Sequence, residues 1–142
     1  MLCFFGAALC FADDPQMGTW KIDEAKSNRG PHMPEYSTVV YETVGDKVKI
    51  TGDGTGKDGN PIHNEWTGKF DGKDYAVTGD PTSDMRSYKK VSDHVLKMTV
   101  KKDGKVTIIG RVIVSDDRKS RTVFTSNAST KDVRTRSVYD KQ

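Results

Sequence analysis

The sequence predicts an all-β fold: a single antiparallel up-and-down β-barrel of about eight to ten strands. Apolar and polar residues alternate in short runs, and alternation with a period of two is typical of half-buried strands. Turn signals built from Gly, Asp and Asn recur at a spacing of roughly ten residues. After the first dozen residues there is no sustained helical period, so we expect no long helix.

Ten strands are expected between these turn signals. They cover residues 18–23, 37–44, 47–51, 61–70, 73–78, 85–91, 94–102, 105–114, 120–126 and 133–139. The first connection, residues 24–36, contains Pro31 and Pro34 and is expected to be a loop with one helical turn at 24–27. A Gly- and Asp-rich segment, residues 52–60, is expected to be a flexible tip.

Two-residue turns predict most of the hairpins. Gly45-Asp46 and Asp71-Gly72 are strong tight-turn signals in the first half of the chain. Ser92-Asp93 and Asp103-Gly104 have the same role in the second half, while residues 79–81 and 116–119 form longer loops. A closed barrel removes the exposed edges that so many short strands would otherwise leave.

Alternation also predicts which side chains point inward. Leu96, Met98 and Val100 share one face of their strand, because residues two apart point the same way. Val48 and Ile50 alternate with lysines in the same manner. We expect all five apolar side chains to face the interior.

Charge and composition narrow the classes of partner. The chain has 142 residues, of which 34% are hydrophobic and 30% charged, enough for one domain with a modest core. The 23 basic and 20 acidic residues give a net charge of +3 and are interleaved along the sequence. The sequence has no run of Lys and Arg of the kind that binds a phosphate backbone, so nucleic acid is not expected as a partner.

The N-terminal segment differs from the rest. Residues 1–12 carry no charge and end abruptly at Asp13-Asp14-Pro15, a pattern typical of the apolar end of a secretory signal peptide cleaved after Ala12. The alternative is a buried first strand. The segment is shorter than the about 20 apolar residues of a spanning helix, so we expect no membrane span.

Both cysteines, Cys3 and Cys10, lie in that segment. The expected barrel domain, residues 13–142, therefore has no disulfide, thiol nucleophile or Cys metal site. We expect a secreted or periplasmic protein without metal or cofactor, and the sequence predicts no oligomeric state.

The two ends of the barrel domain resemble a known superfamily. Gly18-Thr19-Trp20-Lys21 is similar to the Gly-x-Trp opening of the calycins, which include the lipocalins and the fatty-acid-binding proteins, and to a group of secreted bacterial proteins that begin Gly-Thr-Trp-Lys. The last strand, from Thr135 to Lys141, resembles the ending of the fatty-acid-binding branch. The resemblance implies a bacterial calycin-like barrel around a ligand cup.

The resemblance also implies roles for single residues. Trp20 would pack across the closed end, with Arg121, Arg134 or Arg136 as its cationic partner. Segment 24–36 is too short for that branch's pair of lid helices, so no helical lid is expected. Arg136 and Tyr139 are three apart, whereas the branch's carboxylate-binding Arg and Tyr are two apart, so on a regular strand they face opposite sides.

Arginines and tyrosines are the main candidates for a ligand site. Arg86 and Tyr88 share a strand face; facing inward, they would suit a carboxylate or phenolate, although Lys90 on the same side favours the outward orientation. Arg111 lies between Ile109 and Ile113, and an Arg inside an apolar stripe must be paired or bind an anion. Alternatively, Val106, Ile108 and Val112 face inward and Arg111 is solvated.

A second candidate is the pair His63 and Glu65, which share a face and could act as a general base. The opposite face carries Ile62, Asn64 and Trp66, so we expect Trp66 to point inward and His63 and Glu65 to point to solvent. The three histidines are not spaced as metal ligands.

Together these observations predict a secreted lipocalin-like barrel that binds a small apolar or amphipathic molecule. The expected ligand-binding residues are Trp66, Arg86, Tyr88, Met98, Arg111, Arg136 and Tyr139. Two alternatives stay open: an interaction module whose barrel is packed solid, and an enzyme that uses His63/Glu65 or an interior Arg/Tyr pair. A cavity of about 300 Å³ or more would favour ligand binding.

Overall fold

The computed structural model describes residues 14–28, 35–56, 58–130 and 134–142. The expected signal segment, residues 1–12, lies outside the described residues, as does much of the first connection. The strands are β1 (Gly18–Ile22), β2 (Glu35–Val44), β3 (Lys47–Thr55), β4 (Pro61–Gly68), β5 (Tyr75–Thr78), β6 (Met85–Ser92), β7 (Val95–Lys102), β8 (Lys105–Val114), β9 (Ser120–Asn127) and β10 (Arg134–Lys141).

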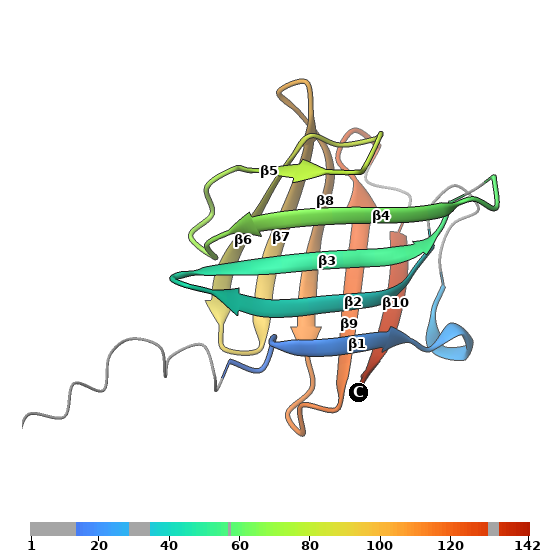
Figure 1. The fold of residues 1–142 in the computed structure, drawn as a ribbon, viewed down its shortest axis with the longest axis vertical. Coiled ribbons are helices and arrows are strands. Elements are labelled where there is room, and N and C mark those ends of the chain that lie inside the picture. The colour runs from blue at the N-terminus through green and yellow to red at the C-terminus, as the bar shows by residue number, and fades with distance from the viewer. Residues whose placement is uncertain (1–13, 29–34, 57, 131–133) are drawn as a thin grey trace, which may run out of the picture.

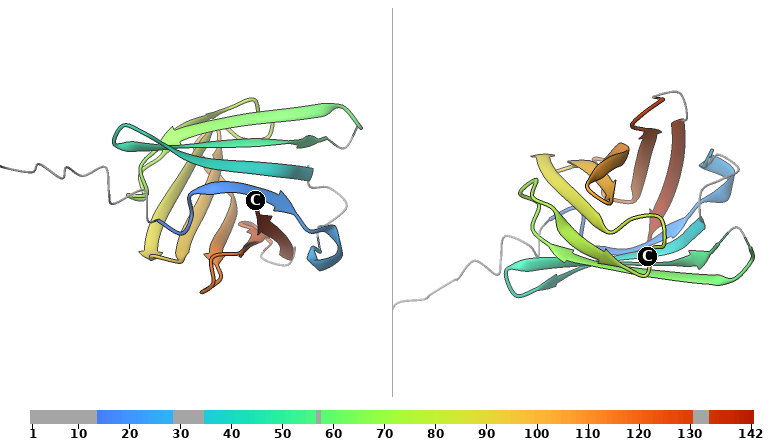
Figure 2. Two further views of the ribbon diagram at one scale, coloured as in Figure 1. Left: turned by 60° about the horizontal axis from the view of Figure 1, so that its bottom comes forward. Right: turned by 90° about the horizontal axis from the view of Figure 1, so that it is seen from above.

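These ten strands close into one antiparallel barrel, which confirms the predicted fold class. Each strand pairs with its neighbours in the sequence, and β1 pairs with β10 to close the ring. Strands β1–β5 form one layer and β6–β10 a second layer behind it, running at a steep angle to the first (Figure 1). The two further views show both layers around a common interior (Figure 2).

The described residues contain one short helix and no spanning one. It is a single 3-10 turn, η1 (Glu24–Lys26), at the position where the sequence predicts one helical turn. The Asp23 side chain caps it by accepting a hydrogen bond from the Lys26 amide. Within these segments no helix is long and apolar enough to cross a bilayer.

Two expectations about the connections are wrong. Asp71-Gly72 is not a two-residue turn between strands, because β4 ends at Gly68, β5 begins at Tyr75, and the connection pairs with β6 instead, where the Gly72 amide donates to the Tyr88 backbone oxygen at 2.9 Å. Residues 52–55 are not part of a flexible tip but continue β3, and they pair with the start of β4. Gly52 makes this pairing compact, because a Cβ there would lie 2.9 Å from Asn64 Oδ1 and 3.1 Å from the Tyr36 ring. Gly52 therefore serves close packing between strands here, not a turn.

The interior faces follow the predicted alternation. Leu96, Met98, Val100, Val48 and Ile50 are all buried, as expected. At one end the core is dominated by aromatic rings: Trp66 lies within 4.9 Å of Tyr88 and 5.6 Å of Tyr75, centroid to centroid, both edge to face.

Trp20 closes one end of the barrel. It is fully buried, and its indole Nε1 donates a hydrogen bond to the Gln16 backbone oxygen at 3.1 Å. Gln16 is itself buried and donates from Nε2 to the backbone oxygen of His94 at 3.4 Å. The chain just before β1 therefore plugs this end.

Candidate functional site

The barrel encloses a cavity of about 330 Å³. This volume is within the usual range of small-molecule sites, and it does not agree with a solidly packed barrel. Its walls come from nearly every strand and from the connection between β5 and β6. The lining residues are Tyr36, Val39, Tyr41, Ile50, Gly52, Asn64, Asp80, Thr82, Arg86, Tyr88, Met98, Val100, Ile108, Arg121, Val123, Thr125, Thr135, Ser137 and Tyr139.

Arg121 forms the floor of this cavity, next to the closed end. Its guanidinium carbon lies 4.3 Å from the centre of the Tyr41 ring, 5.5 Å from Tyr139 and 6.0 Å from Trp20. These are cation–π distances. The resemblance to the calycins implies an arginine beside Trp20, and Arg121, one of the three candidates, lies over the Trp20 ring.

The guanidinium of Arg121 is incompletely hydrogen-bonded. Nη2 donates to the Tyr41 hydroxyl, but Nε and Nη1 are buried and have no hydrogen-bond partner among the described residues. No acidic residue forms an ion pair with Arg121 in that part of the chain. Buried N–H groups without an acceptor are rare and costly, so Arg121 carries unsatisfied donors and a positive charge beside the cavity.

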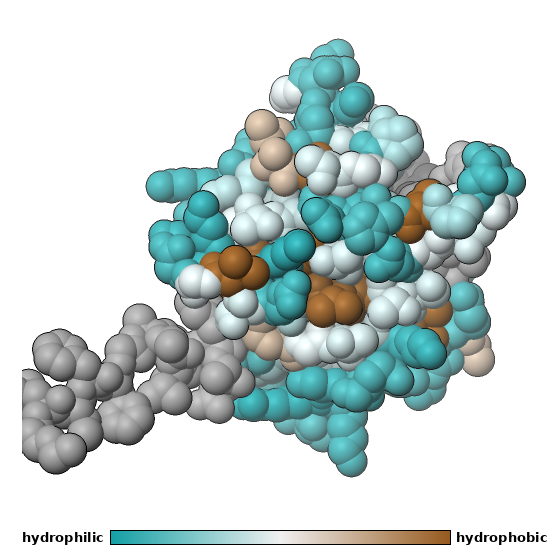
Figure 3. Space-filling view, in the orientation of Figure 1, coloured by the Kyte–Doolittle hydropathy of each residue, from teal (hydrophilic) through white to brown (hydrophobic). Residues whose placement is uncertain are grey.

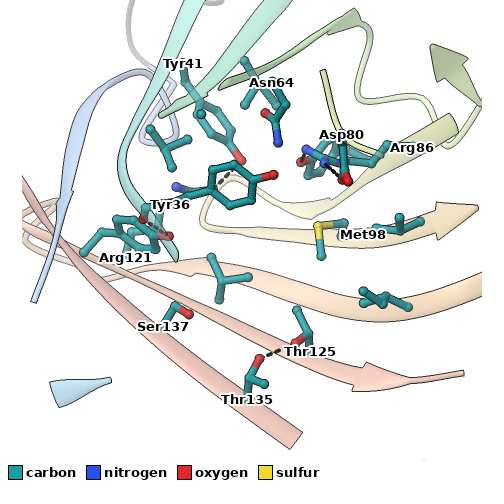
Figure 4. Close-up of a pocket in the computed structure, with 18 of the residues that line it drawn as sticks. Tyr36, Tyr41, Asn64, Asp80, Arg86, Met98, Arg121, Thr125, Thr135 and Ser137 are labelled. Atoms are coloured by element: carbon teal, nitrogen blue, oxygen red, sulfur yellow. Dashed lines mark hydrogen bonds and ion pairs between the residues drawn. The ribbon is translucent and has the colours of Figure 1, made fainter. Parts of the chain in front are cut away.

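Arg86 and Asp80 form a second polar group on the opposite side of the cavity (Figure 4). The Asp80 Oδ2 atom lies 3.9 Å from Arg86 Nη2. Arg86 Nη1 also donates to the Tyr88 hydroxyl at 3.3 Å, while its Nε is buried without a partner among the described residues. Asp80 accepts hydrogen bonds from Ser83 Oγ at 2.6 Å and from the Thr82 amide and hydroxyl.

The charges of this pair are well supported. Burial disfavours the ionised carboxylate, yet hydrogen bonds from Ser83 and Thr82 hold the pKa of Asp80 below its ordinary value. Burial also disfavours the guanidinium, but Tyr88 and Asp80 hold the pKa of Arg86 above its ordinary value. Both groups are therefore charged at neutral pH.

The cavity lining consequently carries a net positive charge. The acidic and basic side chains among the lining residues are two arginines and one aspartate. One aspartate balances one arginine, so one positive charge is left uncompensated in a site shielded from water. An uncompensated charge in such a place is expensive, and a ligand with one negative charge would neutralise it.

Neutral hydroxyls supply the other polar groups. Burial raises the pKa of Tyr41 well above its ordinary value, with Arg121 acting in the opposite direction, so this phenol stays protonated at neutral pH. Tyr139 donates to the backbone oxygen of Tyr36 at 2.9 Å. Thr125 and Thr135 share a hydrogen bond between their hydroxyls on the adjoining wall (Figure 4).

The structure brings four of the seven expected ligand residues into the cavity wall. Arg86, Tyr88, Met98 and Tyr139 all line it. The preference for an outward Arg86/Tyr88 face is wrong. Lys90, which suggested it, lies at the end of that face, where it reaches Asp14 at 3.4 Å.

The other three expected residues lie elsewhere. Trp66 points inward but is packed among aromatic rings, with its Nε1 donating to the backbone oxygen of Arg86 at 2.9 Å, and does not line the cavity. Arg111 and Arg136 are exposed on the outside of the barrel. Ile108 and Val112 face inward, as in the alternative proposed for Arg111. Val106 does not: it is 42% exposed, because the register between β7 and β8 shifts at Val100 and Lys101. The odd spacing does put Arg136 and Tyr139 on opposite faces.

Sequence reasoning missed Asp80, Tyr41 and the position of Arg121 in the cavity. Asp80 lies in a Gly-Asp-Pro loop, which looks like ordinary turn chemistry. For Arg121 a usable signal existed: Arg121, Val123 and Thr125 alternate on one face of β9, and that face is the interior one.

The His63/Glu65 pair lies on the outer surface, not in the cavity. His63 Nδ1 lies 2.5 Å from Asp53 Oδ1, and its Nε2 lies 3.2 Å from Glu65 Oε1. The imidazole side chain is 53% exposed, as the sequence predicts for this face. No group of His, Cys, Asp and Glu able to hold a metal ion occurs among the described residues.

Fold and site thus define a closed antiparallel barrel with an internal cavity of mixed apolar and cationic lining. No family model matches the chain, and no curated protein matches it. One similar solved structure is described as a redesigned beta barrel, mFAP1, bound to DFHBI. It is 14% identical, with a TM-score of 0.41 over 90% of this chain and 95% of that chain.

Proposed function

We propose that this protein binds a small amphipathic molecule with one negative charge inside the barrel. The observation that carries the proposal is the cavity of about 330 Å³ with one uncompensated positive charge. Val39, Ile50, Met98 and Val100 provide an apolar wall for the body of the ligand. The guanidinium groups of Arg121 and Arg86, which line the cavity, provide positive charge for a carboxylate or phenolate.

We also propose that the protein is related to the calycins and that it is exported. The two motifs at the chain ends, together with the contact between Trp20 and Arg121, support a relationship to the calycins. The uncharged residues 1–12 support export to the periplasm or the medium. N-terminal sequencing of protein from its host tests the second point, because an intact Met1 on exported protein would contradict cleavage.

Two apolar positions offer a matched test of binding. Ile108 lines the cavity, whereas Val44 at the end of β2 is not among the lining residues and is 49% exposed. Ile108→Phe is expected to fill part of the cavity and to weaken binding of a fluorescent amphiphile by about tenfold or more, since overpacking costs about 1–3 kcal/mol. Val44→Phe adds an aromatic ring outside the cavity and is expected to leave binding unchanged.

The readout is fluorescence titration with anilinonaphthalene sulfonate, together with native mass spectrometry of protein from its host. A co-purifying small anion that is absent from Ile108→Phe would support the proposal. If both variants bind the probe equally, the probe binds outside the cavity and the proposed function is wrong.

A further inference from the structure

The outside of the layer β6–β10 carries a row of positive charges that the strand register assembles. Lys97 on β7 lies opposite Arg111 on β8, Arg111 lies opposite Phe124 on β9, and Phe124 lies opposite Arg136 on β10. All four side chains are exposed. We call this set, together with Ile109, the basic wall.

The cations of the basic wall have no counter-charge within the described residues. None of Lys97, Arg111 and Arg136 forms an ion pair there, and on β7 and β8 the outward neighbours, Thr99 and Ile113 among them, are uncharged. Like charges directly opposite each other on neighbouring strands are destabilising. The Lys97–Arg111 pair therefore costs the folded barrel free energy, with no ion pair among the described residues to offset it. Lys89, beyond Lys97, faces Asp71 across an isolated bridge and is not part of the wall.

Exposed apolar side chains lie among these cations. Phe124 is 44% exposed and stands between Arg111 and Arg136 in the row, while Ile109 lies one outward position from Arg111 on β8. A hollow of about 460 Å³ runs beside Lys97, Ile109, Arg111 and Phe124. By contrast, the outer face over β1–β5 is mostly hydrophilic, with small separate apolar patches (Figure 3).

We propose that the basic wall is a docking surface for an anionic lipid bilayer. Anionic headgroups complement the three unpaired cations, and lipids move laterally, so they need no fixed spacing to do so. The apolar side chains decide between this partner and a hydrophilic polyanion. Phe124 and Ile109 gain free energy at the boundary between headgroups and acyl chains, whereas a sugar acid or nucleic acid backbone leaves Ile109 in water.

The test is flotation of the full chain with vesicles of two compositions. One contains phosphatidylcholine alone, and the other contains equal parts of phosphatidylcholine and phosphatidylglycerol. The protein is expected to float with the anionic vesicles only and to be released by salt, because exposed charges are screened within about 10 Å at 0.1 M ionic strength.

Matched variants separate the basic wall from net charge. Lys97→Gln/Arg111→Gln removes two charges from the wall, and Lys21→Gln/Lys47→Gln removes two exposed charges from β1 and β3 in the other layer. At about fivefold per basic residue, the wall variant is expected to bind anionic vesicles roughly 25-fold more weakly, and the control about as well as the parent chain. Phe124→Ser is expected to weaken binding without any change in charge.

Three outcomes would overturn the proposal: no flotation with anionic vesicles, an equal loss in both double variants, or binding to heparin or single-stranded DNA without binding to vesicles. Circular dichroism checks that each variant is folded. If the double variant does not fold, Arg136→Gln replaces it, with an expected loss of about fivefold.

Discussion

Replacing Arg121 with Met is expected to weaken binding of an anionic ligand far more than it weakens the barrel. In the ligand-free protein the guanidinium contacts three aromatic rings and donates to Tyr41. Each cation–π contact contributes about 0.5–2 kcal/mol, and a hydrogen bond from a charged donor about 1.5–3 kcal/mol. These favourable contributions are lost in the variant.

The same substitution removes two buried N–H groups without partners in the described part of the chain. Leaving each of them unpaired costs about 1–3 kcal/mol, so their removal offsets most of the loss, and Met fills a similar apolar volume. Replacing a buried charge by a well-packed apolar residue is often neutral for this reason. These ranges leave a net loss of about 1–3 kcal/mol, so the free energy of unfolding is expected to fall by about 2 kcal/mol.

The loss of binding free energy for an anionic ligand is not offset in this way. Removing one member of a buried, hydrogen-bonded charge pair costs about 2–5 kcal/mol, so affinity for the anion is expected to fall by at least about thirtyfold. The assay compares anilinonaphthalene sulfonate with N-phenylnaphthylamine, which has a similar ring system and no charge. Urea unfolding of both proteins without probe measures stability.

The comparison between the two probes decides the matter. Loss of affinity for the sulfonate with little change for the neutral amine would confirm the role of Arg121. If both probes lose affinity equally, or if sulfonate binding is unchanged, Arg121 serves the closed end of the barrel alone and the assignment of charge is wrong. A loss of unfolding free energy far above 2 kcal/mol would show that removing the unpaired N–H groups does not offset the lost contacts of Arg121.

Two further predictions concern stability. Gly79 has φ +82°, and a Cβ there would lie 2.0 Å from the backbone oxygen of His63. Gly79→Ala is therefore expected to destabilise the fold by more than the about 1–3 kcal/mol that a strained backbone costs alone. Gly45→Ala, at φ +63° with open space around it, measures the backbone cost by itself, and equal urea midpoints for the two variants would contradict the prediction. Hydrogen bonds that the His63 ring donates to the carboxylates of Asp53 and then Glu65 raise the pKa of His63 above 6.5. The parent chain is therefore expected to lose stability relative to His63→Gln as pH rises from 6.5 through the raised pKa. Urea midpoints that stay parallel across that range would refute the coupling.

Much of the fold could be predicted from the sequence because strand signals are local. Alternation with a period of two, as in Leu96, Met98 and Val100, needs only one strand and its turns. That is why ten strands, their order and most of their inward faces follow from the chain alone. The same logic failed at residues 52–55, where glycine serves close packing against Asn64, a contact made across strands.

Tertiary structure decided everything that depends on closing the barrel. Period-two alternation divides a strand into two faces but does not say which one points inward, so Arg86 was assigned with the wrong preference and Arg111 stayed open. Closure also brings Asp80 from a loop to Arg86 and places Arg121 on the cavity floor. On the outside, register places Lys97, Arg111 and Arg136 in one row. Charges interleaved along the chain thus become separated in space, because strand pairing and not sequence distance sets which side chains are neighbours.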